Sequence, residues 1–387
     1  MKVLTITEGY PPDRGGGSTY AYEIPRRMAK YKVKTLVLTK SANTKYKDKK
    51  HSHVSVLRIN FPKYKKAGCT ISFKRIKFNL KMLKAAVKRQ GDYDIIHLHS
   101  GFGAKIIAWS LKNLYRVRLP ILMTFHGTFI GNYGAFYQFP ISKLFDIVSK
   151  NLMVSSNCDR YIVVDDGTHA DRVLIENVPK SKIKKHYHAV DCEIFKPKKI
   201  KKKGKVVTFI GRLDPFKGID LFIKAIPDIC KKHNNVKFLF VGDGPLRNDL
   251  KKLAKKLKAH AKVKFVGSVP HSKIPYYVNL SDCLIFPDIR AFENRDYLNL
   301  AMAEAMACGA LYISSSHPRK EWRLPTWITL EKPDPSEITT QLLDVLENPK
   351  KYEKIRKNAR EVALKYFNWD KVVELYYDEF SSLSRGR

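Results

Sequence analysis

Short runs of apolar residues alternate with longer amphipathic stretches along almost the whole chain of 387 residues. The short runs are typical of buried strands, and the stretches between them repeat their apolar positions with the period of a helix. Strands that alternate with helices pair in parallel, because each helix returns the chain to the same end of the sheet. The sequence therefore predicts an α/β fold with parallel sheets.

The predicted strands form two series. The first comprises residues 3–7, 35–38, 94–97, 121–125 and 161–164, and the second comprises 206–210, 237–241, 262–266, 283–286 and 311–314. Between the two series lies a lysine-dense run with no acid, residues 196–205, which is typical of a solvated connection. We therefore predict two Rossmann-like domains facing each other across a cleft, over residues 1–196 and 206–368, with a basic linker over 197–205.

Ligands of open parallel sheets bind where the strands end, so the loops that follow strands are the first candidates for a site. Gly16 and Gly17 close a run of three glycines before a predicted helix. Backbone N–H groups at a helix start favour an anion, although a flexible turn is an equal alternative. The dinucleotide fingerprint needs Gly or Ala where Tyr20 stands, which disfavours a dehydrogenase.

Two cations occupy the first loop of the second series. Arg212 follows the strand at 206–210, and Lys217 comes five residues later, where a helix is predicted to begin. Two cations beside a helix N-terminus suit a diphosphate, whose charge must be stabilised as it leaves. The alternative is an ordinary surface turn in a chain rich in lysine.

A further loop and helix carry three acids. Glu304 lies among Ala and Met residues, where an ionised side chain needs a partner. Asp296 precedes it by eight residues, a little over two helical turns, and Glu293 competes with Asp296 for the same role. Such an acid in an alanine-rich helix favours a functional role.

Three histidines follow or lie in strands of the first series. His126 comes directly after the strand at 121–125 and is placed to project into the cleft, although a single histidine is more often structural. His97 and His99 share one face of a strand, but no cluster of Cys or carboxylates accompanies them. We therefore predict no metal site.

Together these segments resemble the retaining glycosyltransferases of family 4, which have the GT-B fold. The resemblance covers nearly the whole chain and depends on six motifs in the family's order. They are Tyr10-Pro-Pro with Gly15-Gly16-Gly17, Thr124-Phe-His-Gly127, Val190-Asp191 with Phe195-Lys-Pro197, Gly211-Arg-Leu-Asp-Pro-Phe-Lys-Gly218, Val241-Gly-Asp-Gly-Pro245 and Glu304-Ala-Met-Ala-Cys-Gly309. The closing Phe367-Asn-Trp369 also resembles the family, and implies a terminal helix over residues 369–387 that packs back on the first domain.

The resemblance implies transfer of a sugar, with retention, from a nucleotide-diphosphate donor to a hydroxyl acceptor, without a metal or another cofactor. Arg212 and Lys217 would hold the diphosphate, and Glu304 would bind the donor ribose. Gly16 and Gly17 would pack against the donor phosphates and the acceptor.

His126 would lie beside the reacting centre and count with Arg212, Lys217 and Asp296 as catalytic. Asp296 stands where the family has a glutamate, so its contact with the sugar is either rearranged or made by Glu293.

The charge of the chain is strongly positive, with 73 Lys and Arg against 36 Asp and Glu and a formal net charge of +37. The first 150 residues alone hold 29 cations and 7 acids, and residues 42–90 interleave lysines with aromatic residues. This pattern suits an anionic membrane surface and an acceptor that is a lipid or a lipid-linked sugar. A generally lysine-rich surface is an equal alternative.

Three classes of function stay open on the sequence. A glycosyltransferase accounts for the motifs; we expect it in the cytoplasm, with peripheral binding to the inner face of the cell membrane as an option. A GT-B nucleotide-sugar epimerase would need acid and base groups and no acceptor. A nucleic-acid-binding protein accounts only for the charge and comes last, since no known binding module is present.

Overall fold

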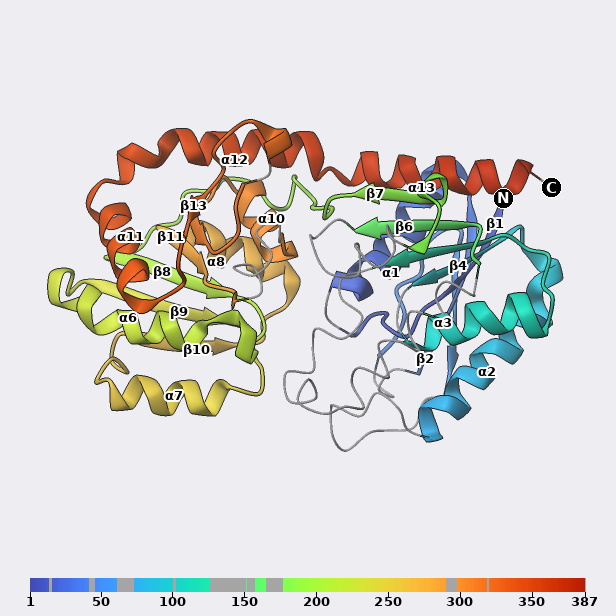
Figure 1. Ribbon diagram of the computed structural model, residues 1–387, viewed down its shortest axis with the longest axis horizontal. Helices are drawn as coiled ribbons and strands as arrows, with labels where there is room; N and C mark the ends of the chain where they lie inside the picture. The colour runs from blue at the N-terminus through green and yellow to red at the C-terminus, as the bar shows by residue number, and fades with distance from the viewer. Residues whose placement is uncertain are drawn as a thin grey trace. The chain divides into compact units, whose positions relative to one another are not determined.

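The structure is a computed structural model that describes residues 1–13, 16–41, 46–60, 73–99, 102–125, 151, 157–164, 177–289, 298–318 and 320–386. The chain divides into two compact units. The first unit comprises Met1–His186 with Asp370–Arg387, and the second comprises Tyr187–Trp369. Each unit is a parallel sheet with helices on both faces (Figure 1).

The first unit contains a sheet whose described strands run in the order β3-β2-β1-β4-β5-β6-β7. The strands are β1 (Lys2–Ile6), β2 (Lys34–Lys40), β3 (Val54–Ile59), β4 (Ile95–His99), β5 (Ile121–Phe125), β6 (Arg160–Val164) and β7 (Ile183–His186). The helices are α1 (Gly16–Met28), α2 (Phe73–Arg89), α3 (Phe102–Trp109) and α13 (Trp369–Arg385), and a π-helical turn, η3 (Ser110–Leu114), continues α3.

The terminal helix α13 returns to the first unit, as expected from the resemblance. A hydrogen bond of 2.9 Å joins Tyr376 Oη to Thr124 Oγ1 of β5. Glu379 forms ion pairs with Arg160 of β6 at 2.5 Å and with Lys184 of β7 at 3.6 Å. Figure 1 shows α13 running along these strands. The last helix is therefore part of the first unit's core although it lies at the far end of the sequence.

The second unit contains a sheet whose described strands run in the order β10-β9-β8-β11-β12-β13. The strands are β8 (Lys205–Ile210), β9 (Val236–Val241), β10 (Val263–Gly267), β11 (Cys283–Phe286), β12 (Tyr312–Ser314) and β13 (Ile328–Thr329). The helices are α6 (Ile219–Lys232), α7 (Arg247–Lys256), α8 (Ile274–Leu280), α10 (Leu300–Ala307), α11 (Pro335–Glu347) and α12 (Glu353–Tyr366).

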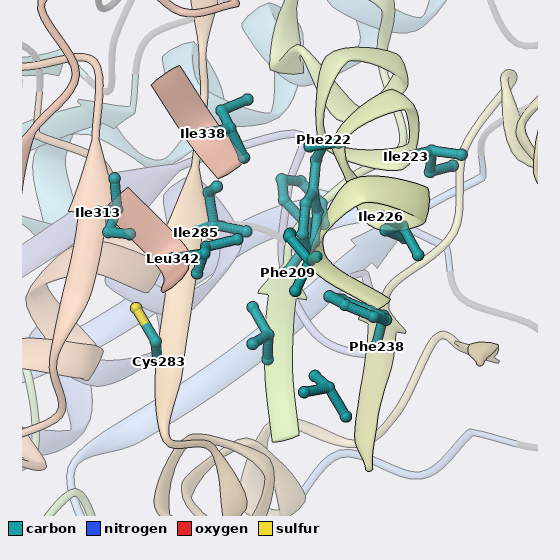
Figure 2. Close-up of a cluster of buried hydrophobic side chains, with 14 of the residues drawn as sticks. Phe209, Phe222, Ile223, Ile226, Phe238, Cys283, Ile285, Ile313, Ile338 and Leu342 are labelled. Carbon is teal, nitrogen blue, oxygen red and sulfur yellow. The ribbon is translucent and has the colours of Figure 1, made fainter. Parts of the chain in front are cut away.

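Hydrophobic clusters cover both faces of the second sheet. On one face, Phe222 of α6 and Leu342 of α11 pack with Phe238 and Ile285 of the strands (Figure 2). On the other face, α8, α10 and α12 contribute a second cluster. Burial on both faces explains why these strands are nearly continuous apolar runs in the sequence.

The predicted strands correspond closely to the observed ones, and the strands that the sequence analysis missed lie at the edges of the sheets. β3 and β7 are the outer strands of the first sheet, and β13 is an outer strand of the second. All three are only partly buried or exposed along their length. An edge strand needs fewer apolar residues, so its sequence resembles that of a loop.

The division between the units falls after His186, whereas the predicted basic linker spans residues 197–205. Val190 and Phe195 are buried in the core of the second unit, and the Val190 N–H donates to the Phe367 carbonyl at 2.7 Å. The segment before the lysine run therefore already belongs to the second unit.

Arg360 of α12 holds the segment before the lysine run in the second unit by hydrogen bonds. Its guanidinium donates to the carbonyls of Phe195 at 2.8 Å, Cys192 at 3.2 Å and Ala307. We expect Arg360→Ala to lower the free energy of unfolding of the second unit by about 2 kcal/mol, because three backbone acceptors lose a charged donor. Chemical denaturation measures this loss, and an unchanged midpoint would show that the three bonds do not stabilise the unit.

Candidate functional site

The second sheet changes direction between β8 and β11. From β8 the chain moves outward through β9 and β10, and it then returns to add β11 on the other side of β8. Ligands of doubly wound sheets bind at the carboxyl ends of the strands at such a switch point. The loops after β8 and β11 are therefore the structural candidates for a binding site, and the first of them carries Arg212 and Lys217.

Lys217 and Asp288 form an ion pair between these two loops. The Lys217 ammonium donates to Asp288 Oδ2 at 2.5 Å, and only 2% of the Asp288 side chain is exposed. Gly218 lets the loops approach this closely: its φ is 62°, and a Cβ there would lie 2.0 Å from the Pro287 carbonyl oxygen. Asp288 therefore fixes where the Lys217 ammonium lies.

Arg212 is held in a similar way but stays accessible. Its Nε and Nη2 donate to the two carboxylate oxygens of Asp214 at 3.0 and 3.1 Å. Two thirds of the Arg212 side chain is exposed, whereas the Asp214 side chain is almost buried. Two of the five guanidinium N–H groups are thus used for orientation, and the exposed remainder can donate to an anion.

The first turn of α6 adds backbone donors to the same loop. α6 begins at Ile219, directly after Gly218, and no side chain caps its N-terminus. Uncapped N–H groups at the positive end of a helix dipole favour phosphate. The loop after β8 therefore combines two oriented cations with a helix N-terminus, a combination suited to a diphosphate.

Glu304 lies in α10 and is buried. Asn299 caps this helix by accepting from the Met302 N–H at 3.0 Å. A hydrogen bond of 2.5 Å joins Glu304 Oε1 to Nε2 of His271, and about half of the His271 side chain is exposed. His271 therefore gives the buried carboxylate its polar contact and connects it to the surface.

In the first unit, Gly16 and Gly17 form the beginning of α1. A Cβ at Gly16 would meet nothing within 4 Å, and the first turn holds no acid. This open helix start follows β1, which lies beside β4 at the switch point of the first sheet. A ligand role for Gly16 and Gly17 stays a prediction.

The structure brings Arg212 and Lys217 together in one loop and places Glu304 on a separate helix of the same unit. Three other predicted site residues, His126, Glu293 and Asp296, lie outside the described residues. Asp288 and His271 were not predicted. Asp288 had a usable signal, since an acid two residues after a buried strand lies at the ligand edge of a sheet. His271 had no such signal.

His97 and His99 are core residues. His97 Nε2 makes a hydrogen bond of 2.8 Å with Thr124 Oγ1. Burial, with the neighbouring His97 as a smaller cause, lowers the pKa of His99 well below its usual value. Within the described part of the chain, no group of three or more His, Cys, Asp or Glu residues is arranged to hold a metal ion.

The described helices include none with the length and apolar character needed to cross a membrane.

The chain has the two-domain, Rossmann-like GT-B fold of glycosyltransferases, with one parallel sheet in each unit. Residues 14–194 match the family model described as Glycosyltransferase Family 4, and residues 190–362 match the model described as Glycosyl transferases group 1. The chain belongs to the family-4 glycosyltransferases.

Individual relatives agree with this assignment. The chain is 22% identical over 391 residues to one component of the phosphatidylinositol N-acetylglucosaminyltransferase of Arabidopsis thaliana, covering 98% of this chain and 82% of that protein. Sucrose-phosphate synthase from Thermosynechococcus elongatus superposes with a TM-score of 0.78 at 20% identity over the full length of both chains. Anabaena HepE in complex with UDP and glucose superposes with a TM-score of 0.73 at 17% identity, covering 99% of this chain and 100% of that one. The two structures show the fold.

Proposed function

We propose that this glycosyltransferase moves a hexosyl group, with retention and without a metal or another cofactor, from a nucleotide-diphosphate sugar to a hydroxyl of a glycan or lipid-linked acceptor. The observation that carries the proposal is the loop after β8, where Arg212, Lys217 and the start of α6 converge at the switch point. Donors oriented before the reaction stabilise the leaving diphosphate without reorganisation.

Two relatives make the proposal more specific. The Arabidopsis relative is named for transfer of N-acetylglucosamine to phosphatidylinositol, and the HepE structure contains UDP. The HepE structure supports a uridine nucleotide donor as the first to be tried, and the name of the Arabidopsis relative supports a lipid acceptor. With such an acceptor, we propose that the enzyme acts as a peripheral protein at the inner face of the cell membrane.

A panel of UDP-, GDP- and ADP-sugars tests the donor. Binding of the correct donor raises the unfolding temperature by an amount that grows with its affinity. The first acceptor assay uses phosphatidylinositol vesicles with UDP-N-acetylglucosamine. The anomeric configuration of the product tests whether the reaction proceeds with retention. Turnover in the presence of EDTA tests whether the reaction is independent of a metal. An epimerised nucleotide sugar in the absence of acceptor would identify an epimerase instead.

Glu304 is proposed to bind the donor ribose hydroxyls. We expect Glu304→Ala to raise KM for the donor about tenfold with a smaller change in kcat, because a contact far from the reacting bond stabilises substrate and transition state alike. His271→Ala is the matched variant, since it removes the neighbour of the carboxylate and keeps the carboxylate itself. A loss confined to kcat would contradict a ribose role for Glu304.

A further inference from the structure

The solvent face of α2 is a row of lysines. Phe78, Met82 and Leu83 of this helix are buried, whereas the lysines between and beside them point to solvent. The exposed lysines are Lys77, Lys81, Lys84 and Lys88. Their spacing of four, three and four residues places all of them on one side of the helix.

This row of lysines is not balanced by nearby acids. Neither α2 nor residues 102–118, which include α3 and η3, contain any Asp or Glu. Among the described residues, none of the four lysines forms an ion pair. Asp92 is the first acid after α2 in the sequence, and it follows the end of the helix. The positive charge of the α2 face is therefore directed to solvent.

Large apolar side chains are exposed among and beside these cations. Leu80, between Lys77 and Lys81 on α2, is 50% exposed. The turn η3 packs against α2, and at its end Leu114 is 63% exposed and Tyr115 is 44% exposed. Exposed leucine and tyrosine beside lysine are the composition of a surface that lies at a lipid headgroup boundary.

We propose that the four lysines together with Leu80, Leu114 and Tyr115, the α2–η3 surface, dock the enzyme on an anionic lipid bilayer. The inference rests on the proposed function for its choice of a membrane. The lysine ammonium groups would contact lipid phosphates, and the three apolar side chains would enter the headgroup layer. A nucleic acid would use the lysines alone, so the exposed leucines favour lipid.

The chain offers a matched control on the second unit. α7 also exposes four lysines, Lys251, Lys252, Lys255 and Lys256. Unlike α2, this helix contains an acid, Asp249, which lies 3.8 Å from Lys252. Changing the four lysines of either helix to Gln removes the same charge from the protein. Any difference in vesicle binding between the two variants is therefore caused by the position of the lysines and not by the net charge.

The test is co-flotation of the full chain with phosphatidylcholine vesicles that contain phosphatidylglycerol, without donor or acceptor. We expect the wild type and the α7 variant to partition equally, and the α2 variant to partition more weakly by at least about tenfold, since each lysine near an anionic surface adds to the attraction. The proposal is overturned if the wild type stays unbound, or if both variants lose the same amount.

A second variant, Leu80→Ser with Leu114→Ser, tests the apolar part at high salt, where electrostatic attraction is screened. We expect vesicle partition to fall and binding to a double-stranded oligonucleotide to stay as in the wild type. If the α2 variant loses only oligonucleotide binding, nucleic acid replaces lipid as the partner.

Because no sugar donor is present in this test, vesicle binding can fail while donor turnover succeeds. The membrane proposal and the proposed function are therefore judged separately.

Discussion

Removal of the Lys217 ammonium is expected to lower the transfer rate by about 10²–10³-fold, because this cation is proposed to stabilise charge that develops on the departing diphosphate. Lys217 lies at the switch point of the second sheet, and its ammonium is held 2.5 Å from Asp288. A donor fixed in place before the reaction contributes more than a mobile one, since no reorganisation is needed.

The single variant Lys217→Ala has a second effect, because it leaves the buried Asp288 carboxylate without its ammonium partner. Breaking a buried ion pair in this way destabilises a protein by about 3 kcal/mol. We therefore expect Lys217→Ala to lose stability as well as activity. Low activity of this variant therefore combines lost catalysis with lost stability.

The double variant Lys217→Ala/Asp288→Asn separates the two effects. It removes one positive and one negative charge, so the net charge of the loops after β8 and β11 is unchanged. We expect stability to recover toward the wild type while kcat stays about 10²–10³-fold low. Recovery of kcat together with stability would refute the role of Lys217 in transfer.

Asp288→Asn alone completes the comparison. The ammonium remains and keeps a hydrogen-bond acceptor but loses the ionic attraction of the carboxylate, so we expect a smaller loss of kcat than in the double variant. KM for the donor should change little, because an amide oxygen still accepts from Lys217. The two-by-two set of variants thus gives the coupling between the residues directly.

The cations of the site were predictable from the sequence because their signal is local. Arg212 and Lys217 lie in one loop between a strand and a helix. The periodicity of the apolar residues indicates both the strand and the helix. Asp288 lies 71 positions after Lys217 in the sequence. Their contact depends on β11 returning to lie beside β8, which no local pattern encodes.

The boundary between the units could not be predicted from the composition of the sequence. A lysine run is the most prominent break in composition, yet Val190 and Phe195 before it are buried in the second unit. Composition reports which segments are solvated, whereas a unit boundary is set by which side chains share a core. The same reason explains α13, whose Tyr376 makes a buried hydrogen bond with Thr124, 252 positions earlier in the sequence.

Gly218→Ala is expected to destabilise the second unit by about 3 kcal/mol or more and to abolish donor binding. Its φ of 62° disfavours any side chain, and the new Cβ would lie 2.0 Å from the Pro287 carbonyl oxygen. The backbone fixes the position of a Cβ and the clash is with a carbonyl oxygen, so no side-chain rotation relieves it. The loops after β8 and β11 would have to separate, and the Lys217–Asp288 contact would be lost with them.

Chemical denaturation followed by tryptophan fluorescence measures this effect, because Trp322, Trp327 and Trp369 lie in the second unit. Gly16→Ala is the matched control: its Cβ would meet nothing within 4 Å, and alanine favours a helix start more than glycine does. We expect Gly16→Ala to unfold at the wild-type midpoint or slightly above it. Equal midpoints for Gly218→Ala and the wild type would show that the two loops are not held together as closely as the structure places them. The fixed position of Lys217 would then lose its physical basis.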